Sequence, residues 1–206
     1  MVYSNYLRAR LFFTLFCLTV CLGGFTMLKV HIFIIGMAGA GKSSLGHRLA
    51  QNMSIRFVDT DQRVCEMLGM PSVRSICQVL GEPIFRNAET GALMELVGQE
   101  PAVISTGSGI CNDNINVTLM KNHGVIIHVD RPLDQLLADI HSDEKQKNPV
   151  GAREDVIQEY NRQIGFYKAA RDLRLDNSKG FNSSFKSLTD MVDQVSEGGP
   201  FPSART

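Results

Sequence analysis

The chain has 206 residues and a mass of 22.8 kDa, the size of one compact domain with a short appended segment. Its 21 Lys and Arg residues balance 21 Asp and Glu residues, so it lacks the positive field that holds many proteins on nucleic acid. A hydrophobic content of 44% with 20% charged residues is typical of a folded globule and argues against global disorder. The composition therefore disfavours both a dedicated nucleic-acid binder and a pair of large domains.

The first 26 residues differ from the rest of the chain. Arg8 and Arg10 precede an uncharged run from Leu11 to Leu28, which is at the lower limit of a membrane-spanning length and has no convincing cleavage site after it. We favour an over-long start or a processed leader, with Met27 as a physiological start, over a retained anchor or true export. Membrane contact is expected only if residues 1–26 are retained.

The cysteine pattern fits neither a zinc ribbon nor a C-x-x-C redox pair. An odd count also fits poorly with a framework of disulfides. We therefore expect buried or idle thiols in a reducing compartment. The five cysteines are Cys17, Cys21, Cys65, Cys77 and Cys111.

From Lys29 onward, short apolar runs alternate with longer segments of helical periodicity. This alternation predicts one α/β domain over residues 27–195, built on a five-stranded parallel sheet with helices on both faces. The predicted strands are Val30–Ile35, Ile55–Val58, Ala102–Ser105, Gly124–Val129 and Leu173–Leu175. The predicted helices are Ser43–Gln51, Gln62–Leu68, Ser72–Leu80, Ile84–Val97, Asp113–Lys121, Leu133–Ile140, Arg153–Arg171 and Ser183–Val195.

Two polar stretches interrupt or end this pattern. Residues 141–152, HSDEKQKNPVGA, are highly charged and contain Pro149 and Gly151, so they form either an ordinary solvated loop or a mobile lid over a nucleotide. Residues 196–206 contain Gly and Pro without periodicity, and we expect a disordered tail there.

The strongest motif is GMAGAGKSS at residues 36–44, which matches G-x-x-x-x-G-K-[ST] between a predicted strand and a predicted helix. The glycines allow consecutive backbone N–H groups to surround phosphate oxygens at the helix N-terminus. Lys42 then neutralises the β- and γ-phosphates, and the Ser43 hydroxyl becomes a ligand of Mg²⁺. The predicted nucleotide-binding residues are Gly36, Gly39, Ala40, Gly41, Lys42, Ser43 and Ser44.

Two carboxylates follow the second predicted strand. Loops at the carboxyl ends of parallel strands line the ligand crevice. Asp59 and Asp61 lie two residues apart, and such positions of an extended segment face the same way. We therefore expect both carboxylates in one site, although an Asp-rich turn that caps the next helix would have the same sequence.

The length after the phosphate loop indicates which class of nucleotide-binding protein this is. The chain leaves no room for the accessory domains of a motor, and no N-K-x-D-like segment reads guanine. A small-molecule kinase is therefore the leading class.

The motifs together resemble those of shikimate kinase. The segments are GMAGAGKSS, FVDTD at residues 57–61, GEPIFRNAE at residues 81–89 and STGSG at residues 105–109, in the same order and spacing. The resemblance runs from about Lys29 to Val195 and is looser beyond Val129. It implies a small P-loop kinase of the nucleoside-monophosphate-kinase type, with a five-stranded parallel sheet and a lid, that phosphorylates the 3-hydroxyl of shikimate with ATP and Mg²⁺.

The resemblance also implies roles for individual residues. Asp61 would hold the acceptor hydroxyls and help to remove a proton, with Asp59 near the metal. Arg86, next to Phe85, would bind the acceptor carboxylate through its planar fork, and Glu89 would orient it from the same helix. A solvated helical ion pair is the alternative for Arg86 and Glu89. The loop against the substrate ring would be Gly107, Ser108 and Gly109.

Three positions depart from the family pattern. Ser108 replaces the middle glycine of a triplet. Asn148 stands before Pro149 where the family has a lid arginine, so Lys147 or Arg153 would supply the catalytic positive charge. Gln163 stands at the position of a second carboxylate-binding arginine, and Arg162 lies one residue earlier, about 100° away around a helix.

These departures leave two alternatives open. One is a related kinase that acts on gluconate or a nucleoside monophosphate, and the other is a catalytically weak nucleotide-binding sensor. We expect a monomer that binds a small acceptor and no nucleic acid. We also expect a cytoplasmic location, or an organellar or membrane-anchored one if the leader is real.

Overall fold

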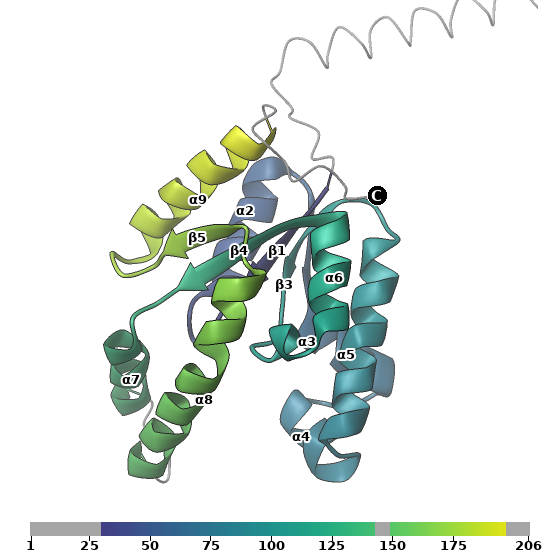
Figure 1. Ribbon diagram of the computed structural model, residues 1–206, viewed down its shortest axis with the longest axis vertical. Coiled ribbons are helices and arrows are strands. Elements are labelled where there is room, and N and C mark those ends of the chain that lie inside the picture. Colours follow the sequence, from purple (N-terminus) through teal and green to yellow (C-terminus); the bar gives the residue numbers. More distant parts are fainter. Residues whose placement is uncertain (1–29, 143–148, 197–206) are drawn as a thin grey trace, which may run out of the picture.

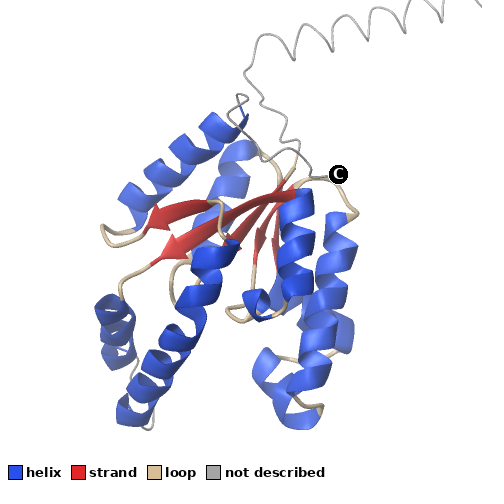
Figure 2. Ribbon diagram, in the orientation of Figure 1, coloured by secondary structure: helices blue, strands red, loops and turns tan. Residues whose placement is uncertain are grey.

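The computed structural model describes residues 30–142 and 149–196, which form a layered α/β fold around one sheet (Figure 2). All five strands are parallel and lie in the order β2-β3-β1-β4-β5. The central strand β1 is buried along its whole length, including His31 at its start, and its four following residues are all apolar, as expected of a strand covered on both faces. The strands are β1 (His31–Ile35), β2 (Arg56–Asp59), β3 (Ala102–Ser105), β4 (Gly124–Asp130) and β5 (Leu173–Asp176).

Helices cover both faces of this sheet (Figure 1). Helices α2 and α9 pack together on one face, and α6 and α8 pack against β4 on the other. Helix α5 packs against α6 and also against α3 and α4. The helices are α2 (Lys42–Met53), α3 (Thr60–Leu68), α4 (Val73–Val79), α5 (Glu82–Val97), a short 3-10 helix (Ile110–Asn112), α6 (Asn114–His123), α7 (Leu133–Ser142), α8 (Pro149–Ala170) and α9 (Phe181–Ser196).

Local sequence signals fix the ends of the helices near the site. The Asp59 side chain accepts hydrogen bonds from the first backbone N–H groups of α3, and Gly69 ends that helix at a φ of 63°. Ser72 and Ser75 form a reciprocal capping box at α4. Pro83 occupies the first turn of α5, where no N–H donor is needed.

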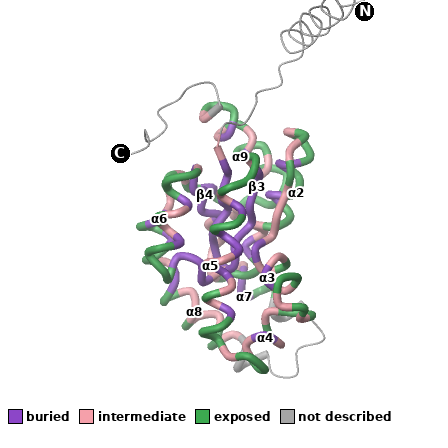
Figure 3. The backbone as a smooth tube through the Cα atoms, turned by 90° about the vertical axis from the view of Figure 1, so that its right-hand side faces the viewer, coloured by how far each residue is buried: buried purple, intermediate pink, exposed green. Residues whose placement is uncertain are grey.

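The apolar side chains form two clusters, and the burial colours of Figure 3 trace the larger one along the sheet. That cluster contains the sheet residues and the inner faces of α2, α8 and α9. The smaller one joins α3, α4 and α5 through Val64, Ile76, Phe85 and Ala92. Because α3 to α5 share their own cluster, they form a helical unit at one end of the sheet.

Most predicted elements are present within a few residues of their predicted bounds, with three differences. Helix α3 begins at Thr60, two residues earlier than expected. Helix α8 begins at Pro149, because proline fits the first turn of a helix. The predicted lid over residues 141–152 therefore includes the end of α7 and the start of α8, and its residues 143–148 lie outside the described residues.

Several further expectations can be compared with this part of the chain. Residues 1–26, Cys17 and Cys21 included, and the tail beyond Ser196 lie outside it. The three described cysteines, Cys65, Cys77 and Cys111, are free thiols. No helix within residues 30–142 and 149–196 is both long and apolar enough to cross a bilayer.

Candidate active site

The candidate site lies at the carboxyl ends of β1, β2 and β3, where a parallel sheet presents its loops. The register pairs Ile34 with Ser105 across β1 and β3, and Asp59 with Ser105 across β2 and β3. The phosphate loop, the Asp59 turn and the loop after β3 therefore begin side by side at one edge.

The phosphate loop adopts the backbone that its glycines predict. Gly36, Gly39 and Gly41 have φ angles of 143°, 76° and 92°, which side-chain-bearing residues rarely adopt. A Cβ atom on Gly36 would also lie 2.6 Å from the Val129 carbonyl oxygen. The Lys42 ammonium donates to the carbonyl oxygen of Met37 at 2.8 Å, which folds the lysine back over the loop.

Two distant side chains hold this loop in place. The Asn177 amide donates to the carbonyl oxygen of Ala40 at 2.8 Å, and Arg131 Nη1 donates to that of Gly39 at 2.7 Å. Both residues follow strands of the same sheet, β5 and β4. Sequence analysis missed both, because no local spacing connects them with the phosphate loop.

Asp59 uses its two carboxylate oxygens for different purposes. Oδ1 accepts from the backbone N–H groups of Asp61 and Gln62, which caps α3. Oδ2 accepts from the Ser43 hydroxyl at 2.8 Å, and that hydroxyl lies 3.1 Å from Ser105 Oγ. The structure thus brings Ser43 and Asp59 together as predicted, and the capping alternative also holds.

Asp61 lies in the first turn of α3, where its carboxylate faces the loop after β3. A Cβ atom on Gly107 would lie 2.6 Å from Asp61 Oδ1 and 2.8 Å from Glu89 Oε1. Both of those oxygens are buried and have no hydrogen-bond partner among the described residues. They are therefore available as acceptors for hydroxyl groups of a bound molecule.

Arg86 lies between two glutamates of α5. Its Nη1 donates to Glu89 Oε2 at 3.0 Å, and its Nε and Nη2 donate to Glu82 Oε1 at 3.2 and 3.1 Å. The Glu89 side chain is 1% exposed and that of Glu82 is 66% exposed. The guanidinium also lies 4.9 Å above the ring of Phe85, which is buried in the α3–α5 cluster.

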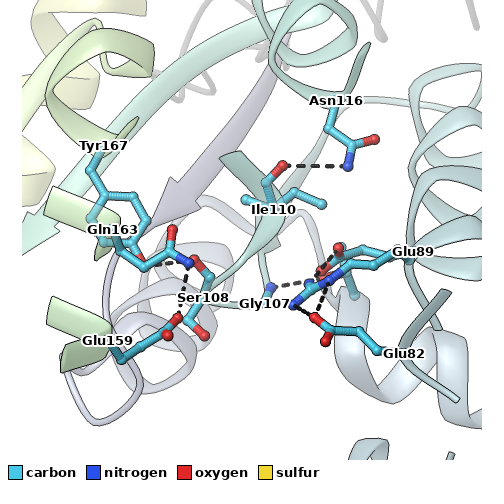
Figure 4. Close-up of polar contacts among 11 residues, drawn as sticks. Glu82, Glu89, Gly107, Ser108, Ile110, Asn116, Glu159, Gln163 and Tyr167 are labelled. Carbon is cyan, nitrogen blue, oxygen red and sulfur yellow. Dashed lines mark hydrogen bonds and ion pairs between the residues drawn. The ribbon is translucent and has the colours of Figure 1, made fainter. Parts of the chain in front are cut away.

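The loop from Gly107 to Gly109 passes close to these charged groups. The Gly107 N–H donates to the Thr60 hydroxyl at 3.1 Å, and a Cβ atom on Gly109 would lie 2.6 Å from Arg86 Nη1. Ser108 does not have a positive φ, so serine is accommodated without backbone strain. Its carbonyl oxygen accepts from the Tyr167 hydroxyl (Figure 4).

Burial and mutual interaction shift the pKa values of the central charged groups. Burial lowers the pKa of Lys42 to about 8, although Asp61 and Asp59 counteract this. Burial and the neighbouring charge of Asp59 raise the pKa of Asp61, whereas Lys42 and Arg86 lower it. Burial likewise raises the pKa of Glu89, with Arg86 opposing. These carboxyl groups are consequently better proton acceptors than exposed ones.

The α8 side of the site is only partly as predicted. Arg162 has a 62% exposed side chain and pairs with Glu159. Gln163, one position further along the helix, is buried and donates to Glu159 Oε1 at 2.9 Å. Figure 4 shows Gln163 near Tyr167 and Ser108, opposite Glu82 and Glu89. Arg153 lies in α8, and Lys147 and Asn148 lie outside the described residues.

The site geometry agrees with a comparison against protein families. A family model described as shikimate kinase matches residues 38–193. The chain belongs to the shikimate kinase family. Its activity is accordingly that of the family, a phosphoryl transfer from ATP to a hydroxyl group of shikimate, which confirms the resemblance in the motifs.

Curated relatives of this family support the assignment. A shikimate kinase of Clostridium botulinum (strain Eklund 17B / Type B) is 32% identical over 69% of this chain and 85% of its own length. One of Clostridium beijerinckii is 28% identical over 80% of this chain and 96% of its own length. The chain thus corresponds to most of each relative.

Solved structures show the same fold. Shikimate kinase from Bacteroides thetaiotaomicron has a TM-score of 0.71 at 25% identity, over 80% of this chain and 98% of that one. The Acinetobacter baumannii enzyme, solved in complex with shikimate, has a TM-score of 0.70 at 22% identity, over 82% and 93%. A gluconokinase from Sinorhizobium meliloti shares the fold at a TM-score of 0.53 and 15% identity, over 82% and 94%, so the gluconate alternative has weaker support.

Proposed function

We propose that the residues at this edge of the sheet phosphorylate the 3-hydroxyl of shikimate by direct in-line transfer from ATP, without a covalent enzyme intermediate. The observation that carries the proposal is the convergence of Arg86, Glu89 and Asp61 on the loop at residues 107–109. That loop follows β3, the immediate neighbour of the strand that carries the phosphate loop. Donor and acceptor sites on adjacent strands favour direct transfer.

The phosphate loop is the proposed site of ATP. Its N–H groups and the N-terminus of α2 would bind the phosphates, and Lys42 would neutralise the β- and γ-phosphates. Ser43 Oγ and Asp59 Oδ2, only 2.8 Å apart, are the oxygen ligands that suit Mg²⁺, which when bound would offset charge on the phosphates. Ala40 and Ser44 complete the loop and the first turn of α2.

Arg86 is the proposed partner of the acceptor carboxylate. Glu82 and Glu89 fix the guanidinium in place and leave one N–H on Nη1 and one on Nη2 for a ligand. This pair of donors matches the two oxygens of a carboxylate. Phe85 supports the guanidinium from the helical cluster, and its direct contact with the acceptor remains a prediction.

Asp61 is the proposed partner of the reacting hydroxyl. Its buried Oδ1, which has no partner in the described residues, would accept a hydrogen bond from that hydroxyl and then its proton. The hydroxyl oxygen attacks the γ-phosphorus while the bond to the ADP oxygen breaks. Glycine at position 107 allows the acceptor ring to approach, because a side chain there would collide with Asp61 and Glu89.

The transition state requires a positive charge close to the transferring phosphoryl group. We propose that Arg153 or Lys147 supplies this charge. Each residue is replaced by alanine in turn, and the variant with the larger loss of kcat identifies the residue responsible. Arg162 is the less favoured second carboxylate partner, because its side chain is largely exposed and already pairs with Glu159. Because ATP is the donor, we propose a cytoplasmic or organellar location.

Coupled ADP release by the purified full chain tests the proposal, with Mg²⁺-ATP and a panel of shikimate, gluconate and nucleoside monophosphates. We expect turnover with shikimate, a loss of at least a hundredfold in Lys42→Ala, and wild-type activity in Lys121→Ala on the exposed side of α6. Turnover with gluconate and none with shikimate would refute the assignment of shikimate as the acceptor. Tight ATP binding without turnover of any acceptor would favour the sensor alternative.

A further inference from the structure

Tyr167 is a buried polar residue that the proposed chemistry does not use. Among the described residues it is the largest fully buried side chain, with 0% exposure, and it comes from α8, opposite Glu82 and Glu89 (Figure 4). A buried phenol needs a hydrogen-bond partner, since an unpaired hydroxyl is costly. Tyr167 finds this partner in the backbone of the acceptor loop.

The Tyr167 hydroxyl donates to the carbonyl oxygen of Ser108 at 2.6 Å. Ser108 is the middle residue of a loop whose two glycines pass within close contact of Asp61, Glu89 and Arg86. Other bonds fix the two ends of this loop, from Gly107 N–H to Thr60 and from Asn112 N–H to the Gly109 carbonyl. The tyrosine holds its centre.

The Tyr167 side chain also contacts the phosphate loop, the proposed site of ATP. Its hydroxyl lies 3.9 Å from Met37 Sδ, and Met37 is the residue whose carbonyl oxygen binds Lys42. Its ring lies 5.0 Å from that of buried His128 at the end of β4. One side chain therefore contacts the loops that follow β1 and β3. Burial raises the pKa of Tyr167, which keeps the hydroxyl a donor at all working pH values.

We infer that Tyr167 is a positioning residue of the reaction, which sets the loop at residues 107–109 against Arg86 and Asp61 and fixes that loop relative to the phosphate loop. The inference rests on the proposed function. The Tyr167 side chain is fully buried and bonds to the loop after β3, so its loss should loosen the acceptor site more than the ATP site. A displacement of about an ångström at a reacting centre is enough to reduce turnover strongly.

The test is Tyr167→Phe, which keeps the ring and removes the hydroxyl. We expect the shikimate KM to rise about tenfold, kcat to fall severalfold and the ATP KM to stay within about twofold. Tyr160→Phe, a phenol lost from the same helix, is the matched control and should leave all three constants unchanged. Tyr167→Met, a second hydroxyl-free variant, should give the same ratio of the two KM changes.

Hydrogen exchange of the free protein provides a readout that does not depend on the acceptor. The amides of Ile110 and Asn112, which are bonded within the loop, should exchange at least severalfold faster in Tyr167→Phe and at the wild-type rate in Tyr160→Phe. A lower melting temperature with unchanged KM values and exchange would overturn the inference, as would equal rises in both KM values. If wild-type protein left shikimate untouched, the proposed function would fail, while the exchange comparison would still decide the role of Tyr167.

Discussion

Replacement of Arg86 by lysine tests the acceptor site most directly, because it keeps the charge and removes the planar fork. The structure assigns three donor contacts of Arg86 to Glu82 and Glu89 and leaves one N–H on each terminal nitrogen. A lysine ammonium that still pairs with Glu89 can offer the acceptor carboxylate one of these two bonds at most. The variant should therefore lose at least one charge-assisted hydrogen bond to the acceptor.

Such a bond contributes about 1.5–3 kcal/mol, which corresponds to a rise in the shikimate KM of about tenfold to a hundredfold. The ATP KM should change by less than about twofold, because Arg86 touches none of the residues of the phosphate loop. Steady-state kinetics of coupled ADP release, with each substrate varied in turn, measures both constants.

Arg63→Lys is a matched control. Arg63 is also 34% exposed and pairs with a glutamate through two close contacts, but that partner, Glu95, lies nine positions beyond Arg86 along α5. Its replacement should leave both KM values unchanged. A shikimate KM within twofold of wild type in Arg86→Lys, or an equal rise in the ATP KM, would refute the assignment of Arg86 to the acceptor carboxylate.

Three further predictions concern the surroundings of this arginine and the core. In the same assay, Glu89→Gln should raise the shikimate KM at least fivefold and Glu82→Gln less than threefold, because of these two side chains only that of Glu89 is buried. A larger rise in Glu82→Gln than in Glu89→Gln would contradict this prediction. Gly109→Ala should raise the shikimate KM at a nearly unchanged melting temperature, because its φ of −90° suits alanine whereas the new Cβ displaces the Arg86 guanidinium. His128, whose pKa burial lowers to about 4, takes up its proton far more readily in the unfolded chain, so acidification from pH 7 to 5 should cost about 2 kcal/mol of unfolding free energy in urea titrations. His128→Asn should lose that part of the pH dependence of stability. An identical pH dependence in the variant and the wild type would exclude His128 as its source.

Local spacing was sufficient to predict much of the site. The phosphate loop follows from its glycines and lysine, and the Arg86–Glu89 pair follows from a separation of three residues on a helix. The Glu82 contact had an equally readable signal, a separation of four residues, that sequence analysis did not use. Each of these features depends on residues within one turn or one loop.

Asp59 and Asp61 lie in one site for a reason different from the predicted one. The prediction placed both on extended chain, whereas α3 begins at Thr60 and Asp61 points to the site from the first helical turn. In sequence, an aspartate that caps a helix cannot be told from the end of a strand that carries two exposed acidic residues. The hydrogen bonds from the Asp61 and Gln62 N–H groups to Asp59 Oδ1 show that the helix starts here.

Three contacts between distant segments could not be predicted. Tyr167 reaches Ser108, and Asn177 and Arg131 reach the phosphate loop, across 59, 137 and 92 positions of the chain. Such pairs depend on strand order and on how α8 crosses the sheet, which periodicity does not encode. For the same reason, the inward position of Gln163 rather than Arg162 appears only when the helix has been placed.

The order of the strands has a consequence for how this enzyme can change during evolution. Neighbouring parallel strands lie about 4.8 Å apart, so the segments that follow β1 and β3 are held at a fixed separation by the sheet itself. In the proposed function, the segment after β1 binds ATP and the segment after β3 lies against the acceptor. Substitutions after β3, in α3 and in α5 could therefore change the acceptor while the backbone of the phosphate loop stays in place.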